Sequence, residues 1–177
     1  MDRFRLYPFP GTAVPDLAIE AELTRRAESA LEIAYVVTGP VGSILLPSPE
    51  APQRRDGLWQ HTCFEAFFAL GSGAYLEANF APSQRWAAYR FDDYRAGMAP
   101  AEAFPAPDIR LEAAPERLVL TVRLAPLPML AEVGALGLSA VIEDRSGGKS
   151  WWALAHPADK PDFHDRDCFV AQLPAAG

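Results

Sequence analysis

Two short segments place carboxyl, amide and aromatic side chains in a regular pattern. In LWQHTCFEAFFAL the odd-numbered positions include Trp59 and Glu65, and in YLEANF they include Glu77 and Asn79. Flat aromatic rings stack on the apolar faces of sugar rings, while fixed carboxylates and amides bond hydroxyl groups. These residue types at this spacing therefore predict a site for a carbohydrate-like, small polar molecule.

Such a site requires both segments to be strands whose odd-numbered side chains share one face. Successive side chains of a strand point to opposite faces, so Phe64 and Phe68 would face a core while Glu65 points away from it. A slip of one residue would exchange the faces, and the two strands agree only if an odd number of residues separates them. We therefore predict an odd-length loop around GSGA. The resulting face would carry Trp59, His61, Glu65, Phe67, Tyr75, Glu77 and Asn79.

The same face has other interpretations. Its aromatic rings could cover a second apolar layer, with polar groups that satisfy one another, because buried polar groups are normally hydrogen-bonded. An exposed aromatic face would instead suit a protein-interaction module, since large apolar patches mark contact surfaces. The sequence leaves these alternatives open.

The segment HPADKPDFHD concentrates imidazole and carboxylate groups, namely His156, Asp159, Asp162, His164 and Asp165. Such groups bind divalent metals, so a metal-dependent enzyme built on His156, Asp162 and His164 is an alternative function. The spacing matches no established ligand motif, and Pro157 and Pro161 indicate a surface loop. We therefore expect a hydrogen-bonded loop and no metal.

Enzyme motifs are weak or missing. Glu65 and Glu77 have the chemistry of a glycosidase carboxyl pair, but two carboxyl groups alone do not define one. The sequence has no G-x-S-x-G, P-loop or G-x-G-x-x-G motif, so it provides neither a nucleophile elbow nor a phosphate cradle. The sequence therefore favours a non-catalytic binding module over an enzyme.

Short strands must position these groups. Apolar side chains alternate over residues 31–37, 118–124 and 136–142, a pattern typical of strands. Proline clusters between such runs indicate loops. Short helices are expected near 126–133 and near 16–26, although the second segment also has the pattern of a strand. The sequence predicts an all-β fold, an antiparallel immunoglobulin-like or jelly-roll β-sandwich with one or two short helices.

Length and charge narrow the class of protein. With 177 residues, half of them apolar, the chain fits one domain, 1–177, with a full core. Its net charge of −7 repels phosphate groups and anionic lipids, so neither nucleic acid nor a membrane is an expected partner. The N-terminal segment lacks the apolar core of a secretory signal. We therefore expect a cytoplasmic protein with Cys63 and Cys168 as free thiols.

Three blocks of the sequence carry a family resemblance. RRDGLWQHTCFEAFF (54–68), YLEANFAPSQRWAAYRFDDYRAGM (75–98) and GLSAVIEDRSGGKSWWALAHPADKPDFH (137–164) together resemble the bacterial DOMON-like domain family. That family is related in fold to the family-nine carbohydrate-binding modules. The resemblance covers nearly the whole chain and implies an immunoglobulin-like or jelly-roll β-sandwich.

The resemblance also implies a site. The related modules hold a sugar between two aromatic rings, with acidic, amide and arginine side chains around it. Trp59 followed by Glu65 is similar to one half of such a site, so Trp151 or Trp152 is implied as the second ring and Arg85 or Arg90 as the guanidinium. The predicted ligand-binding set is Trp59, Glu65, Glu77, Asn79, Arg90, Trp152 and His156.

Some DOMON relatives carry haem on axial methionine and histidine ligands. Here Met98 and Met129 lie near prolines rather than in strands that face a histidine, and the sequence has no CxxCH motif. No cofactor is therefore expected.

Overall fold

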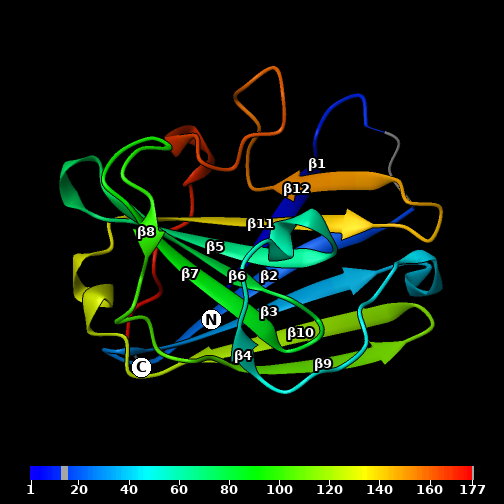
Figure 1. The fold of residues 1–177 in the computed structure, drawn as a ribbon, viewed down its shortest axis with the longest axis horizontal. Coiled ribbons are helices and arrows are strands. Elements are labelled where there is room, and N and C mark those ends of the chain that lie inside the picture. The colour runs from blue at the N-terminus through cyan, green and yellow to red at the C-terminus, as the bar shows by residue number, and fades with distance from the viewer. Residues whose placement is uncertain (13–15, 177) are drawn as a thin grey trace.

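Residues 1–12 and 16–176, as described by the computed structural model, form an all-β fold of twelve strands and five short 3-10 helices (Figure 1). The strands are β1 (Asp2–Pro8), β2 (Ala18–Ala27), β3 (Ala30–Thr38), β4 (Gln53–Arg54), β5 (Cys63–Ala69), β6 (Tyr75–Phe80), β7 (Arg85–Phe91), β8 (Ala99–Pro100), β9 (Asp108–Ala114), β10 (Arg117–Leu124), β11 (Ala135–Glu143) and β12 (Lys149–Ala153). The 3-10 helices are η1 (Val41–Ser43), η2 (Leu58–Gln60), η3 (Gly71–Gly73), η4 (Pro128–Glu132) and η5 (Arg166–Cys168). Within this described part, no helix is long and apolar enough to cross a membrane.

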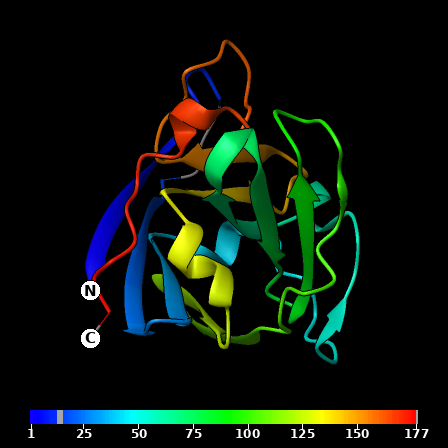
Figure 2. The ribbon, with the colours of Figure 1, turned by 90° about the vertical axis from the view of Figure 1, so that its left-hand side faces the viewer.

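The strands form one curled sheet in the order β4-β7-β6-β5-β11-β12-β1-β2-β3-β10-β9, with β8 paired to β7. β1 joins the two halves, because its first residues pair with β2 while Tyr7 and Pro8 pair with β12. The sheet bends there, so that β5, β6 and β7 lie over β2, β3 and β10 (Figures 1 and 2). The segment around η4 bridges the halves at one end: the Leu127 amide donates to Ser29 O, and the Gly134 amide donates to Ala69 O.

The predicted all-β class is confirmed, but the prediction of a wholly antiparallel sheet is wrong. β4 runs parallel to β7, with Gln53 opposite Arg85 and Arg54 opposite Trp86. This edge strand has two residues and follows a proline-rich stretch, so no period-two pattern marks it. Of the two short helices expected, residues 128–132 form η4, while residues 18–27 adopt the strand alternative. The immunoglobulin-like or jelly-roll strand order stays a prediction.

The main core lies between the two halves of the sheet. Even-numbered side chains of β5 and β6, such as Phe64 and Phe80, pack there with Ile33 of β3 and Leu120 of β10. Glu65 lies opposite Asn79, and Ala69 lies opposite Tyr75, so residues 70–74 form a five-residue connection. The predicted odd-length loop is therefore confirmed, and the odd-numbered side chains of both strands point to the outer face.

A second apolar cluster covers part of that outer face. Phe67 stacks on Phe169 of the C-terminal segment with ring centroids 5.5 Å apart, and Tyr75 stacks on Phe91 at 4.7 Å. This region is the closed apolar layer that the alternative interpretation of the sequence expected. Since Phe67 and Tyr75 are buried, they cannot belong to an exposed docking surface for a protein partner.

The second apolar cluster packs against Gly137, which has no side chain. A Cβ atom added at Gly137 would lie 2.5 Å from Cδ1 of Phe169, so Gly137→Ala must displace that ring. We expect a loss of about 1–3 kcal/mol in the free energy of unfolding, the usual effect of overpacking. Urea denaturation measures it. Gly134→Ala is the matched control, because no atom lies within 4 Å of its added Cβ; equal stability of the two variants would contradict the prediction.

Candidate functional site

A cavity of about 460 Å³ opens on the outer face of the half-sheet that contains β5, β6 and β7. Its volume falls in the range of small-molecule sites, which is roughly 300–1,000 Å³. Strands supply its floor, while η2, the 92–98 loop and the 161–164 segment supply its rim. The lining residues are Trp59, Glu65, Glu77, Tyr89, Phe91, Arg95, Met98, Val141, Trp151, Pro161, Phe163 and His164.

Two tryptophans line this cavity. Trp59 lies on η2 and is 55% exposed, and the left-handed backbone of Gly57 (φ 75°) precedes that helix. Trp151 lies on β12 and is half-buried. Trp152 points to the opposite face, is 2% exposed in the main core, and donates its indole N–H to Ser150 Oγ over 2.8 Å. Of the two tryptophans that the sequence left open, Trp151 therefore lines the cavity and Trp152 does not.

Two carboxyl groups form the polar floor. Glu65 on β5 is 3% exposed, and its Oε2 accepts a hydrogen bond from Ser139 Oγ over 3.1 Å. Glu77 on β6 lies two residues before Asn79, the residue that pairs with Glu65. Burial raises the pKa of Glu65 to about 8, and the neighbouring Glu77 charge adds to this effect. Burial also raises the pKa of Glu77, although the hydrogen bond from Asn79 and the charge of Arg95 oppose that shift.

Asn79 supports this floor from below. It is fully buried, lies opposite Glu65, and donates from Nδ2 to Glu77 Oε1 over 2.7 Å. Its Oδ1 is one of two buried polar side-chain atoms that lack a partner among the described residues. The amide group of Asn79 therefore fixes the orientation of Glu77 from within the buried layer.

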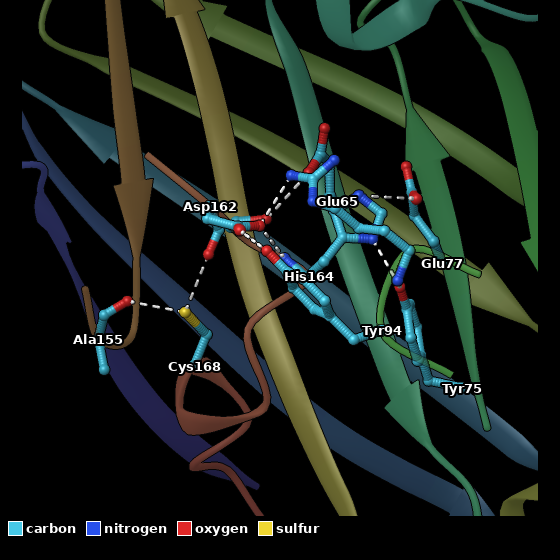
Figure 3. Close-up of polar contacts among 10 residues, drawn as sticks. Glu65, Tyr75, Glu77, Tyr94, Ala155, Asp162, His164 and Cys168 are labelled. Atoms are coloured by element: carbon cyan, nitrogen blue, oxygen red, sulfur yellow. Dashed lines mark hydrogen bonds and ion pairs between the residues drawn. The ribbon is translucent and has the colours of Figure 1, made fainter. Parts of the chain in front are cut away.

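A hydrogen-bond chain sets the tautomer of His164 (Figure 3). The amide of Arg95 donates to Tyr75 Oη over 3.2 Å, and that hydroxyl lies 2.7 Å from His164 Nδ1. Because the described residues offer the tyrosine O–H no other acceptor, it donates to Nδ1, which leaves the ring proton on Nε2. Nε2 lies 3.6 Å from Glu77 Oε2, beyond hydrogen-bond length. Burial lowers the pKa of His164 to about 4, so the ring is neutral at pH 7.

Asp162 ties the two rim loops together (Figure 3). Its Oδ1 accepts from Arg95 Nη2 over 2.7 Å and from the His164 amide over 3.1 Å, and its Oδ2 accepts from the Tyr94 hydroxyl. Although burial acts to raise the pKa of Asp162, the hydrogen bonds from Arg95 and Tyr94 dominate and lower it. Asp162 therefore stays ionised at neutral pH, and Arg95 is held by it at the cavity rim.

The structure brings together only part of the predicted ligand-binding set. Trp59, Glu65 and Glu77 line the cavity, and Asn79 lies beneath it. Arg90 does not line the cavity. It follows Trp86 and Ala88 on the core-side face of β7 and pairs with Asp92 at the surface. The phase of the strand excludes Arg90 from the outer face.

Two predicted histidines also lie elsewhere. His156 bonds Tyr7 O through Nε2 over 2.8 Å and packs edge-on against Phe9, outside the cavity lining. His61, expected on the same face as Glu65, is exposed and lies 2.7 Å from Glu143 Oε2. Both precede or follow the regular strand segments, so strand periodicity does not determine their direction.

Sequence reasoning missed Arg95, and it left His164 out of the predicted ligand-binding set. Arg95 lies in the loop after β7 with φ 51°, so no strand or helix periodicity indicates its direction. In the metal alternative, His156 bonds Tyr7 O, whereas Asp162 accepts from the His164 amide and from Arg95. Within residues 1–12 and 16–176, no group of three or more histidine, cysteine, aspartate or glutamate side chains is arranged to hold a metal ion.

Comparisons with known proteins show a shared fold. No family model matches the chain, and no curated protein matches it. A candidate carbohydrate-binding protein from Bacteroides uniformis is 14% identical in sequence, with a TM-score of 0.62 over 95% of this chain and 84% of that one. This chain has the fold of that protein. The DOMON-like assignment stays a prediction.

Two further solved structures are similar to a lesser degree. Both are family-nine carbohydrate-binding modules from Caldicellulosiruptor kristjanssonii. The complex with cellotriose is 12% identical, with a TM-score of 0.49 over 89% of this chain and 74% of that one. The complex with glucose is 14% identical, with a TM-score of 0.48 over 83% and 71%.

Proposed function

We propose that this chain is a non-catalytic module that binds a carbohydrate-like molecule in the cavity lined by Trp59 and Trp151. One observation carries the proposal: two tryptophans, two carboxyl groups, a neutral histidine and an arginine converge on one cavity of ligand size. Aromatic rings offer stacking surfaces, and the polar groups offer both donors and acceptors for hydroxyl groups. The shared fold with a candidate carbohydrate-binding protein supports this function.

The polar atoms match what a hydroxyl-bearing ligand needs. His164 presents an N–H donor at Nε2, while Glu77 Oε2 is an acceptor 3.6 Å away. A hydroxyl group between them would accept from the first and donate to the second. The DOMON-like assignment, the immunoglobulin-like or jelly-roll topology and the cytoplasmic location form part of the same proposal.

Intrinsic fluorescence tests this function. Of the four tryptophans, Trp86 and Trp152 lie in the main core, so a ligand in the cavity perturbs the emission of Trp59 and Trp151. We expect a saturable change on titration with glucose, galactose, mannose, N-acetylglucosamine or their disaccharides. Absence of any response across this panel, repeated by calorimetry, would refute carbohydrate binding.

Removal of one stacking ring provides a sharper result. We expect Trp59→Ala to raise the Kd of any binding sugar about tenfold or more, because burial of a large aromatic side chain contributes roughly 1.5–3 kcal/mol. The exposed Trp59 makes little contribution to the core, so the unfolding transition should stay within about 0.5 kcal/mol of the unaltered chain. Tyr7→Ala removes an exposed ring outside the cavity lining and is the matched control. An unchanged Kd in Trp59→Ala would contradict the proposed site.

A further inference from the structure

The cavity floor has an imbalance of charge. Among the described residues that line the cavity, Glu65 and Glu77 are the two carboxyl groups and Arg95 is the only arginine or lysine. The Arg95 guanidinium is bonded to the buried carboxylate of Asp162, which is 3% exposed in its side chain. His164 is neutral at pH 7. The two floor carboxyl groups therefore face the cavity without an uncommitted cation.

We propose that the cavity selects ligands that carry an ammonium group, such as amino sugars, and that Glu65 and Glu77 bind this group. The inference rests on the proposed function, because it names the class of ligand for the same cavity. It assigns to the ligand the positive charge that the protein does not supply.

The contacts of both carboxyl groups leave room for this partner. Glu65 Oε2 accepts from Ser139, while no donor among the described residues reaches Glu65 Oε1. Glu77 Oε1 accepts from Asn79, and Glu77 Oε2 is 3.6 Å from His164 Nε2, too far for a hydrogen bond. Each carboxyl group thus keeps one oxygen without a short contact. An ammonium group has three N–H donors, enough to serve both.

The walls favour the same ligand chemistry. Five aromatic side chains line the cavity, namely Trp59, Tyr89, Phe91, Trp151 and Phe163. The face of an aromatic ring attracts a cation within about 6 Å, and sites for alkylammonium ligands combine such rings with carboxylates. A neutral sugar would use the rings and hydroxyl partners but would leave the carboxyl pair without a cationic partner. An ammonium ligand uses both features.

Binding would exchange one proton for one cation. Glu65 is protonated at neutral pH because burial and the Glu77 charge raise its pKa to about 8. When the ammonium group binds, the Glu65 O–H bond breaks, the proton passes to solvent, and the carboxylate pairs with the ligand. No covalent bond to the ligand forms. Affinity should therefore rise with pH up to about 8 and level off above it.

Other titratable groups around Glu65 stay constant over that range. Burial raises the pKa of Tyr35 and Cys63 well above their usual values, and it raises that of Tyr89, so all three remain neutral. His164 titrates near pH 4, and Arg95 remains charged. The pH dependence between 6 and 8 therefore belongs to the Glu65–Glu77 pair.

Calorimetry on the unaltered chain tests the inference directly. At pH 6.5 we expect glucosamine to bind about tenfold or more tightly than glucose and N-acetylglucosamine, both of which are neutral. Choline has no N–H donor and a charge that does not titrate, so it tests the charge and ring contacts alone. Its affinity should rise by up to about tenfold per pH unit between pH 6 and 8. Glu65→Gln should abolish this slope. Glu112→Gln, which removes an exposed carboxylate on β9, should retain it.

The outcomes separate this inference from the proposed function. If glucose binds as tightly as glucosamine, the ammonium preference is refuted while carbohydrate binding stands. If choline binds and no sugar does, the carboxyl pair is an ammonium site and the carbohydrate proposal is refuted. If none of these probes binds, both fail.

Discussion

Replacement of Glu65 by glutamine should stabilise the protein above neutral pH and flatten its stability profile. In the folded chain the pKa of Glu65 is about 8, well above its usual value of 4.5. A raised folded-state pKa means that stability is fully present below the unfolded pKa and is lost as the pH rises through the folded pKa. The unaltered protein should therefore lose on the order of 3–5 kcal/mol between about pH 4.5 and pH 8.

The Glu65→Gln variant lacks this loss, because an amide does not ionise. The change also conserves volume, and the new amide belongs to the residue paired with Asn79, whose Oδ1 has no donor among the described residues. We expect the free energy of unfolding at pH 8 to exceed that of the unaltered chain by about 2–4 kcal/mol, and the two to converge near pH 4. Urea denaturation at several pH values measures both curves.

Glu112→Gln again supplies the control, since this exposed carboxylate on β9 lies outside the cavity lining and its removal should leave the slope unchanged. Parallel curves for Glu65→Gln and the unaltered chain would show that Glu65 is ionised in the folded protein. A stabilised variant that no longer binds choline would mean that the carboxyl group is retained for binding at a cost in stability, a common property of functional sites.

The residues of the cavity floor could be predicted from the sequence because they lie on strands. Period-two alternation placed Glu65, Glu77 and Asn79 on one face, and the five-residue connection confirmed the register. The same physics limited the prediction in WW at 151–152, where two identical side chains point to opposite faces and alternation alone does not decide which one faces the cavity. The flanking pattern of β12 is too short to set the phase.

The residues of the cavity rim could not be predicted in the same way, because they lie on loops. Arg95 and His164 reach the cavity through turns held by Asp162, and the contact between Arg95 and Asp162 joins segments 67 residues apart in the sequence. Arg90, five residues before Arg95, is equally plausible in composition but lies on the other side of its strand. Long-range packing rather than local periodicity therefore selects the arginine.

Truncation of Asp162 should have the second largest effect, on both stability and binding. Asp162→Ala leaves the His164 amide and the Tyr94 hydroxyl without their acceptor and releases Arg95. Because Arg95 is half-exposed, its ion pair contributes little, and we expect a loss of about 2–3 kcal/mol, mainly from the unsatisfied donors. Hydrogen exchange should accelerate over residues 92–98, and glucosamine or choline should bind more weakly.

The pH dependence of this stabilisation has the opposite sign to that of Glu65. Since the folded-state pKa of Asp162 is lowered, its contribution is present above the unfolded pKa of about 3.8 and is lost as the pH falls below it. The difference between the unaltered chain and Asp162→Ala should therefore be larger at neutral pH than in acid. Asp159→Ala, an exposed carboxylate three residues earlier in the same segment, is the control and should behave as the unaltered chain does. A full difference that persists at pH 2 would show that Asp162 stabilises the rim through packing and not through its charge.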